Sequence, residues 1–485
     1  MGIVAKQSIL NTIYTYIGFL FGALNTLFLF TYIFNKTDYG LVTYLMTAGN
    51  LLWPFLTFGM NNTIIKFYHS YESDTDKNRF FSWILLTPII TTLLALFAYY
   101  LFYQRIHNYF ENANAVVSPY VFMILVLGFF TAYFELFFAW AKIHLKSVGG
   151  NFIKAIFLRV FISLLLVLVY LDLLSIPQFI DTFGAAYVLR TLVMGIIAYR
   201  IQPFSFQLKK IEKVRELITY ASLVLIASLI ATYLLDLDKV MIEYFRPIEE
   251  LPAYSIAIYI ASVIAVPARA LLQITTPLTA KFINQKEYSS LNDLNKKSST
   301  NGLLTAGIVA VLILTNTHSI FALVPKDYTL FIEIVFYIAL IRVFDASLGV
   351  TNSILLNSEA YKWILIFGIG ILALAFGLNI ALIPKYGITG AAIATFIAYT
   401  VFNSIKLIFV KKFFNIHPFQ LKSIGVLILL VLIGIVFYYV KFNNLSPILS
   451  ILIKGTLTSI LFIFLLLKLK LSPEISASIM KFLKR

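Results

Sequence analysis

The sequence predicts an all-α polytopic membrane protein with about 14 transmembrane helices, and three observations support this fold class. Of the 485 residues, 60% are hydrophobic and only 12% are charged, and the mean hydropathy is +0.89, unlike the composition of a water-soluble protein. The apolar residues recur in blocks of about twenty, which is the length of a helix that crosses a bilayer. The short alternating segments that mark an outer-membrane barrel are missing from these blocks.

Six spans are expected in a first lobe, residues 1–202. The first begins directly after the N-terminal residues and is too long for a secretory signal peptide, so we expect no such signal. Each later span lies between polar, basic or turn-forming residues. The expected spans are 8–34, 41–65, 80–103, 118–141, 152–171 and 182–201.

A basic cytoplasmic linker, residues 203–216, is expected before a second six-helix lobe, residues 217–412. Two more helices are expected within residues 413–467, and a basic cytoplasmic tail at residues 468–485. The expected spans of this part are 217–245, 253–280, 299–324, 328–351, 361–383, 388–410, 423–440 and 447–467. No loop exceeds about twenty residues, which excludes a soluble catalytic domain within the chain.

Basic residues are distributed unevenly between the two sides of these spans. With the N-terminus in the cytoplasm, 25 Lys and Arg residues lie on the cytoplasmic side and 6 on the opposite side. Because cytoplasmic loops of membrane proteins carry an excess of Lys and Arg, both termini are predicted to be cytoplasmic. The formal net charge of +16 therefore reports orientation, and we expect no nucleic-acid partner.

Two patterns recur along the chain and predict an internal repeat. Tyr39 and Tyr254 each precede a Lys-Phe pair by 27 residues, at an offset of 215, and Gly184-Ala185-Ala186 opens the sixth span as Gly390-Ala391-Ala392 opens the twelfth, 206 residues later. Six is an even number, so both halves enter from the same side as parallel repeats.

Prolines interrupt corresponding spans of the two halves. Pro54 lies in the second span, and Pro267 and Pro277 lie in the eighth, its repeat partner. Proline removes a backbone donor and bends a helix. Interrupted helices at corresponding positions indicate a transport site, although kinks that serve only packing would give the same pattern.

Several basic residues lie inside the predicted spans, where a charge costs about 2.5–3.5 kcal/mol near the helix centre. Arg159, Arg190 and Arg269 have no acidic residue within one helical turn, and Arg269 follows Pro267 near mid-span. Arg342 has Asp345 three residues later. Guanidinium groups facing a cavity suit a phosphate or diphosphate, because the planar fork binds two oxygens at once. We therefore expect the substrate-binding residues to be Arg269, Arg190, Arg159 and Arg342.

Embedded carboxylates are the candidates for binding a coupling cation. Asp236, Lys239 and Glu243 share one helical face, which favours a local salt-bridge cluster. Glu135 has no local base and is expected either to pair with an Arg across the bundle or to carry a proton. The expected cation-coupling residues are Asp236, Asp238, Glu135 and Asp345.

Redox and metal chemistry have little support in the sequence. The chain has no Cys, which excludes disulfides and thiol catalysis, and its His residues lack metal-ligand spacing. We expect no cofactor and no catalytic residue, and a possible coupling ion, Na⁺ or H⁺.

Four stretches resemble the Wzx-type polysaccharide flippases of the MOP superfamily, which also includes the MATE exporters and MurJ. They are residues 35–40 (Asn-Lys-Thr-Asp-Tyr-Gly), residues 236–239, Tyr254 with the later prolines, and residues 379–392, which contain Ile383-Pro384-Lys385-Tyr386-Gly387. The last stretch is similar to the superfamily's turn between helices eleven and twelve.

The resemblance implies a V-shaped pair of six-helix lobes that works by alternating access in the bacterial cytoplasmic membrane. The implied cargo is an undecaprenyl-diphosphate-linked oligosaccharide, such as an O-antigen or capsule repeat unit for lipopolysaccharide or capsule assembly, with membrane lipids and glycan-assembly proteins as partners. In MurJ-like relatives, cavity arginines bind the diphosphate and helices thirteen and fourteen border a lipid groove. The first helix here has no arginine, which makes lipid II an unexpected cargo.

Other functions remain open at this point. A cation-coupled small-molecule exporter would be expected to have an acidic cavity, which the embedded arginines disfavour. A membrane glycosyltransferase or polymerase would be expected to have an acidic cluster in a long outer loop, and the outer loops here are short. A scaffold without transport activity would also fit the composition.

Overall fold

The computed structural model describes residues 3–325, 328, 331–442, 445–469, 471–473 and 475. Within these residues all regular secondary structure is helical, which confirms the predicted all-α class. Contacts divide the chain into two compact units, Met1–Pro252 and Ala253–Arg485. Most of the expected basic tail, 468–485, lies outside the described residues.

The helices have the lengths and composition of membrane spans. Within the described residues, 11 helices are long and apolar enough to cross a bilayer. The number of candidate spans is 13 if each of two bent helix pairs is one span. The longest of the 11 is broken at Gly387, where two helices meet. The chain is a multi-pass membrane protein, and the expected number of 14 is not itself confirmed.

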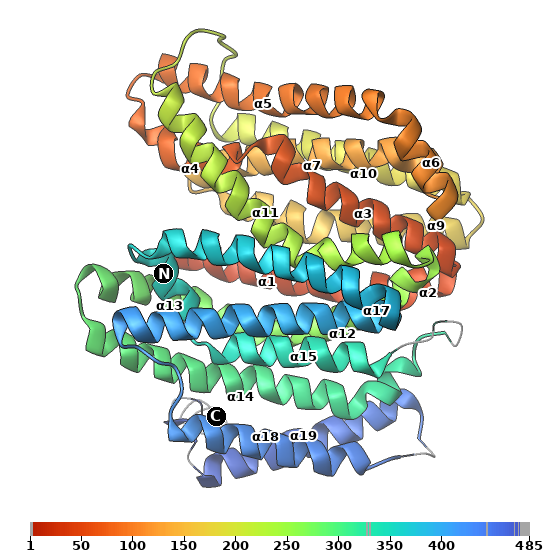
Figure 1. Ribbon diagram of the computed structural model, residues 1–485, viewed down its shortest axis with the longest axis vertical. Helices are drawn as coiled ribbons and strands as arrows, with labels where there is room; N and C mark the ends of the chain where they lie inside the picture. Colours follow the sequence, from red (N-terminus) through yellow and green to blue (C-terminus); the bar gives the residue numbers. More distant parts are fainter. Residues whose placement is uncertain are drawn as a thin grey trace. The chain divides into compact units, whose positions relative to one another are not determined.

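The first unit is a bundle in which α3 and α7 pack together and α10 covers α7 (Figure 1). Side-chain caps begin several of its helices, as at Ser73, whose hydroxyl accepts a hydrogen bond from the Asp76 N–H at 3.0 Å. Its helices are α1 Ile3–Ala23, α2 Phe30–Ile33, α3 Lys36–Thr57, α4 Met60–Phe67, α5 Asp74–Leu101, α6 Tyr103–Ala113, α7 Val121–Ile143, α8 Ser147–Phe152, α9 Leu158–Tyr170, α10 Ile176–Ile201 and α11 Val214–Phe245.

Short π and 3-10 segments join some of these helices. Two π segments, Leu24–Leu29 after α1 and Ile153–Phe157 before α9, were not expected from the sequence. The buried Asn25 in the first of them donates a hydrogen bond to the Arg159 carbonyl at 2.8 Å and accepts one from the Ser163 hydroxyl at 2.5 Å. Such bulges bend a helix locally, and here a polar contact between helices holds the bend.

The second predicted span is broken close to its proline. Pro54 lies in the last turn of α3, and Phe58 and Gly59 then have positive φ angles of 48° and 70° before α4 begins. The helices on either side are bent by 44°. The expected interruption is confirmed, and its sharpest point is the left-handed pair that follows the proline.

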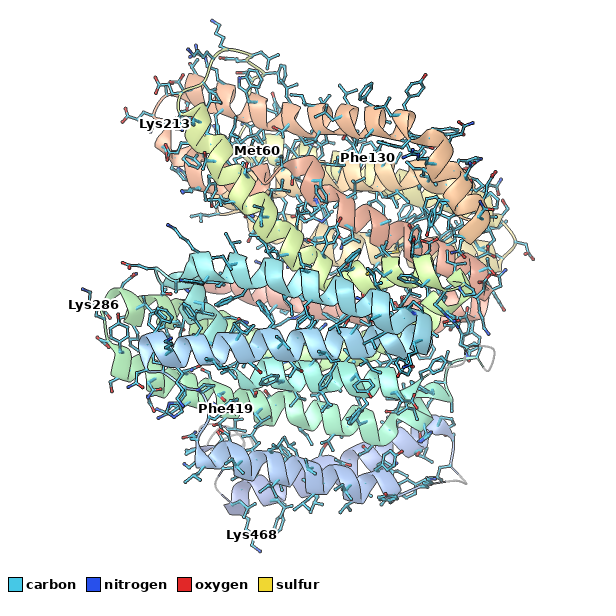
Figure 2. The ribbon with its side chains drawn as sticks, in the orientation of Figure 1. Met60, Phe130, Lys213, Lys286, Phe419 and Lys468 are labelled. Atoms are coloured by element: carbon cyan, nitrogen blue, oxygen red, sulfur yellow. The ribbon has the colours of Figure 1, made fainter. Side chains whose placement is uncertain are left out.

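The linker between α10 and α11 is extended and packs on the first unit. The Trp83 indole donates a hydrogen bond to the Lys209 carbonyl at 2.9 Å. Lys213, with a φ of 58°, precedes α11 (Figure 2). Met60, at the start of α4, lines a pocket together with Lys210 and Ile211 of the linker. Because α11 packs on α3 and α4, contacts divide the chain after Pro252 and not at the expected linker, residues 203–216.

The second unit contains the remaining helices, with α14 packed against α13, α15, α18 and α19 (Figure 1). Lys286, with a φ of 57°, lies in the turn between α13 and α14 (Figure 2). The helices are α12 Leu251–Ser262, which begins at the unit boundary, α13 Val266–Asn284, α14 Tyr288–Phe321, α15 Ile332–Ser347, α16 Thr351–Asn357, α17 Tyr361–Phe414, α18 Leu421–Tyr439 and α19 Pro447–Leu469.

Breaks also occur in three spans of the second unit. A 3-10 segment, Val263–Ala265, separates α12 from α13 just before Pro267, as the proline predicts. α15 and α16 are bent by 59° near Gly349, whose φ is +60°. This break was not expected from the sequence. Gly387 breaks α17 with φ 59° and ψ −144°, a conformation that glycine adopts far more easily than other residues.

Candidate functional site

Three basic groups surround one carboxylate in the membrane-spanning part of the first unit, and we call this set the N-terminal cluster: Glu135, Lys142, Lys154 and Arg190. The Lys154 Nζ lies 2.5 Å from the Glu135 Oε1. Glu135 also interacts electrostatically with Lys142 and Arg190. Three bases against one acid leave a formal excess of two positive charges. Glu135 does form an ion pair with a distant segment of the chain, but its close partner is a lysine and not the expected arginine.

Arg190 is held in the N-terminal cluster by aromatic rings. Its side chain is 6% exposed, and its guanidinium carbon lies 4.4 Å from the centre of the Phe134 ring and 4.7 Å from that of Tyr187. One guanidinium nitrogen donates a hydrogen bond to the Thr131 hydroxyl at 3.2 Å. The buried Nε has no hydrogen-bond partner within the described residues. Cation–π contacts stabilise this charge without neutralising it.

Arg159 is not one of the residues of the N-terminal cluster. Its Nη1 donates a hydrogen bond to the Ala155 carbonyl at 2.8 Å. The same nitrogen is so close to Gly18 on α1 that a Cβ there would lie only 2.6 Å away. Arg159 therefore lies at the packing contact between α9 and α1, and its expected contact with substrate stays a prediction.

A second basic set, the C-terminal cluster, consists of Arg269, Arg342, Asp345 and Lys406. Asp345 interacts electrostatically with both Arg269 and Lys406, and Arg269 also interacts with Arg342. Lys406 is 3% exposed, and its Nζ donates a hydrogen bond to the Asn352 Oδ1 at 2.9 Å. Here too, three bases and one acid leave a formal excess of two positive charges.

Arg342 and Asp345 do not form the close ion pair that their spacing of three residues suggested. The ion pairs within 4.0 Å among the described residues do not include them, and the buried Arg342 Nε has no hydrogen-bond partner there. Asp345 instead interacts with bases from α13 and α17. The expected local pair is therefore wrong, because packing brings other helices to the carboxylate.

The two clusters occupy matching positions in the two halves of the sequence. Glu135 and Asp345 are 210 residues apart, between the two repeat offsets of 206 and 215. They lie in α7 and α15, which are the fourth span of each predicted half. The central carboxylate of each cluster is thus repeat-related. The repeat offsets of 206 and 215 are the feature of the sequence from which the correspondence between Glu135 and Asp345 could have been predicted.

Two of the expected coupling carboxylates lie beside a base on α11. The Lys239 Nζ is 2.7 Å from the Asp236 Oδ1, and the Asn50 Nδ2 donates a hydrogen bond to the Asp236 Oδ2 at 2.7 Å. Asp238 is 6% exposed, interacts electrostatically with Lys239 and accepts its backbone N–H at 2.9 Å. The predicted pairing of Asp236 with Lys239 is confirmed. No group of three or more His, Asp or Glu residues suited to a metal ion occurs in the described part of the chain.

Glu243 is not part of that salt-bridge cluster, which corrects the expectation from its spacing. Its carboxylate accepts hydrogen bonds from the Asn114 Nδ2 at 2.9 Å and the Tyr109 hydroxyl at 3.3 Å. Tyr44 also forms a hydrogen bond with it. The side chain is 2% exposed, and no basic residue lies within ion-pair distance of it among the described residues. The correct partners come from α3, α6 and the loop after α6, which residue spacing on α11 cannot reveal.

An apolar groove of about 620 Å³ lies along α14, α15 and α18 in the second unit. Small residues leave space for the groove, including Gly307, Ala310 and Gly434. Large apolar side chains such as Phe336, Leu340 and Val431 form its walls. Glu333 is its charged residue. A groove of this composition on a membrane protein suits a hydrocarbon chain.

The sequence motifs of the resemblance mainly have structural roles. The Asn35 side chain accepts the Asp38 N–H at 2.8 Å and so caps α3. The Tyr39 ring stacks on Phe30 at 4.8 Å. At the later motif, a Cβ on Gly390 would lie 2.2 Å from the Leu382 carbonyl oxygen, so the two arms of α17 meet too closely for a side chain. These residues explain the shared fold and do not identify a cargo.

Comparisons with known proteins agree with this architecture. The chain is 24% identical to an uncharacterized membrane protein, MJ1068, of Methanocaldococcus jannaschii, over 82% of each chain. Its fold is similar to that of the lipid II flippase MurJ in an inward closed conformation, with a TM-score of 0.73, 17% identity and coverage of 94% of this chain and 98% of that one. The family model described as polysaccharide biosynthesis protein matches residues 4–283, more than half of the chain. The expected resemblance to the polysaccharide flippases is confirmed at the level of the family, and the chain belongs to the polysaccharide biosynthesis protein family.

Proposed function

We propose that this protein is a transporter that moves a lipid-linked oligosaccharide across the membrane, with its headgroup diphosphate bound by basic side chains inside the bundle. The observation that carries the proposal is the presence of surplus positive charge in the membrane-spanning helices of both units. Charge at such depth is costly, and a functional ligand is a common reason for it. The family and the MurJ-like fold support the same class of cargo.

Arginine is the side chain best suited to the diphosphate. Arg190, Arg269 and Arg342 each present a planar fork that can bind two oxygens of one phosphate. Lys154 and Lys406 add point charges to the two clusters. A diphosphate at either cluster would offset the excess charge of the bases. A cation as cargo would instead be repelled, which argues against a MATE-like small-molecule exporter.

The apolar groove on α14, α15 and α18 is a suitable place for the polyprenyl tail. Its walls are almost wholly aliphatic and aromatic. A hydrocarbon chain gains little free energy by moving from lipid into a protein groove unless it packs closely there. The tail would then stay near the lipid while the polar headgroup enters the bundle. An undecaprenyl carrier bearing an O-antigen or capsule repeat unit is the cargo that we propose.

Cation coupling is part of the proposal. Asp236, Asp238, Glu135 and Asp345 are the carboxylates that the sequence suggested, and each lies near at least one base. A coupling ion would therefore have to compete with an ammonium or guanidinium group. Asp236→Asn tests this directly: transport with unchanged dependence on Na⁺ and pH would leave Asp236 as a structural partner of Lys239.

We also propose the cytoplasmic membrane of a bacterium as the site of action, with both termini in the cytoplasm. The basic residues of the linker and loops support this orientation through the positive-inside rule. Glycan-assembly proteins are proposed partners. The role is that of a transporter and not that of an enzyme.

The decisive experiment uses purified protein in vesicles that contain a fluorescent polyprenyl-diphosphate oligosaccharide. A membrane-impermeant quencher then reports how much of the lipid has changed leaflet. Arg269→Ala is expected to bind this lipid about ten- to a hundredfold less tightly, because a charge-assisted hydrogen bond is worth roughly 1.5–3 kcal/mol. Arg269→Lys should recover part of the activity, since it keeps the charge and loses the fork.

The matched control is Arg105→Ala, because Arg105 is exposed on α6 and outside both clusters. It should transport at the wild-type rate. Wild-type binding and transport by Arg269→Ala would refute the assignment of this arginine. Failure of the wild-type protein to move any lipid-linked oligosaccharide would refute the proposed function.

A further inference from the structure

The carboxyl group of Glu243 has an unusual environment in the first unit. It is 2% exposed and lies in the last turn of α11, Val214–Phe245. The backbone carbonyls at a helix C-terminus carry partial negative charge, which disfavours a second negative charge there. Burial without a counter-ion is also costly for an ionised carboxylate. Both effects favour the neutral form of this side chain.

The groups that contact Glu243 are neutral hydrogen-bonding partners. Asn114 donates from its Nδ2 to the Glu243 Oε1 at 2.9 Å and to the Glu243 carbonyl at 3.0 Å. Tyr109 and Tyr44 supply hydroxyl groups. A hydroxyl can donate to a carboxylate or rotate to accept the proton of a carboxylic acid. The two tyrosines can therefore satisfy Glu243 in either protonation state.

Charged groups near Glu243 have ionic or hydrogen-bonding partners of their own. On α11, Lys239 is bound to Asp236 at 2.7 Å. After α11, Arg246 is bound to Glu250 at 2.6 Å, and Glu249 accepts the Thr37 hydroxyl at 2.8 Å.

Aromatic groups lie around Glu243 on three helices. On α6, burial and the neighbouring Glu243 raise the pKa of Tyr109, so its hydroxyl stays protonated. Tyr244 stacks on the Tyr109 ring at 5.6 Å. His107, also on α6, is occupied by Glu111 at 3.0 Å and by the Ser118 hydroxyl at 2.8 Å. Tyr44 is the titratable group facing Glu243 from α3. Glu243 is the buried carboxyl group of this set.

A cavity of about 560 Å³, open to the surface of the first unit, has polar and apolar residues in its lining, and Glu243 is one of them. Its lining includes Thr37, Asn114, Arg246 and Glu249 as well as Glu243. Thr37 lies in the first turn of α3, Asn114 follows α6, and Arg246 and Glu249 follow α11. The predicted topology places these helix ends on the side opposite the N-terminus. Water in such a polar cavity is a path for a proton between that side and the buried carboxyl group.

We propose that Glu243 is a proton-binding site, which takes up one proton from the side of the membrane opposite the N-terminus. The carboxylate accepts the proton from a water-borne donor and becomes a carboxylic acid, and the same proton leaves by the reverse step. Deprotonation strengthens the hydrogen bonds from Asn114, Tyr109 and Tyr44, because bonds to an ionised acceptor are stronger. Protonation therefore loosens the end of α11 from α3 and from the segment after α6, and in the proposed transporter this couples the proton to movement of α11.

Proton binding is tested by infrared spectroscopy of the full-length protein in vesicles, independently of any cargo. The wild type should show the carbonyl band of a buried carboxylic acid at a pH where exposed carboxylates are ionised. Glu243→Gln should remove that band. The matched control Glu111→Gln should keep it, since Glu111 is an exposed carboxylate on the adjacent α6 with a side chain that is 55% exposed. A spectrum unchanged by Glu243→Gln would overturn the proposal.

The link to transport rests on the proposed function and is tested separately. Wild-type transport of the fluorescent lipid-linked oligosaccharide should change with outer pH by up to about tenfold per pH unit, the limit for one titrating proton. Glu243→Gln should abolish this dependence, and Tyr109→Phe should shift its midpoint. A wild-type protein that shows the infrared band but moves no lipid would refute the proposed function and leave the proton site established. Transport by Glu243→Gln with the wild-type pH profile would refute the coupling.

Discussion

The ion pair between Glu135 and Lys154 has unequal partners, and this inequality predicts which of two mutations is more damaging. The paired atoms are 2.5 Å apart, but the glutamate side chain is 10% exposed and the lysine side chain 49% exposed. Lys154→Met leaves a buried carboxylate without its hydrogen-bonded cation. Glu135→Gln leaves a lysine that can turn its ammonium group into water. The lysine mutation should therefore cost more stability than the glutamate mutation.

The magnitudes follow from burial. Removing one partner of a buried ion pair costs about 3–5 kcal/mol, and Lys154→Met should be near the lower end because Lys142 and Arg190 still interact with Glu135. Glu135→Gln should cost about 1–2 kcal/mol, somewhat more than the loss of an exposed pair, because the buried Arg190 also loses a neighbouring acid. The double mutant should be more stable than Lys154→Met alone, since it contains no unpaired buried carboxylate.

The assay is reversible unfolding of the purified protein by SDS in mixed micelles, which gives the free energy of unfolding. Lys146→Met serves as the control, because Lys146 is exposed and lies just before α8, the helix that precedes the π segment with Lys154. Its effect should be within about 0.5 kcal/mol. If Glu135→Gln destabilises the protein as much as Lys154→Met, then the exposure of Lys154 does not determine the energetics of the pair and the reasoning is refuted.

Three further predictions follow from single positions. Gly387→Ala should lower the free energy of unfolding by about 1–3 kcal/mol, because φ 59° and ψ −144° are strained for alanine; Gly370→Ala, which meets no atom within 4 Å, should not destabilise the protein in the same SDS titration. Burial lowers the pKa of His144 below its ordinary value of 6.5, so the unfolded state binds more protons and stability should fall as the pH drops through about 6.5. His144→Gln should flatten this decline in Tm measured between about pH 5 and pH 8, and an unchanged decline would assign it to other groups. Lys210→Cys and Asp172→Cys, both exposed in this Cys-free chain, should react with an impermeant thiol reagent from opposite sides of the membrane, and labelling of both in intact cells would contradict the topology.

The sequence alone determined the features that depend on composition and on near neighbours along a helix. Long apolar blocks indicated membrane helices, because twenty residues of helix match the thickness of a bilayer. Pro54, Pro267 and Gly387 marked breaks, because their backbone preferences act locally. The pairing of Asp236 with Lys239 was also readable, since residues three apart share a helical face. Each of these inferences needs only the chain within a few turns.

Only the tertiary structure decided which embedded charges lie together. Lys154 reaches Glu135 from 19 residues away, and Asp345 interacts with bases from two other helices. Glu243 lies within reach of Lys239 by spacing, yet Asn114 and two tyrosines bind it. Helices that are apolar on every side carry little periodic signal, so the sequence does not say how each is rotated. Rotation and packing choose the partners of a buried charge, and for that reason the environment of Glu243 became visible only in the folded protein.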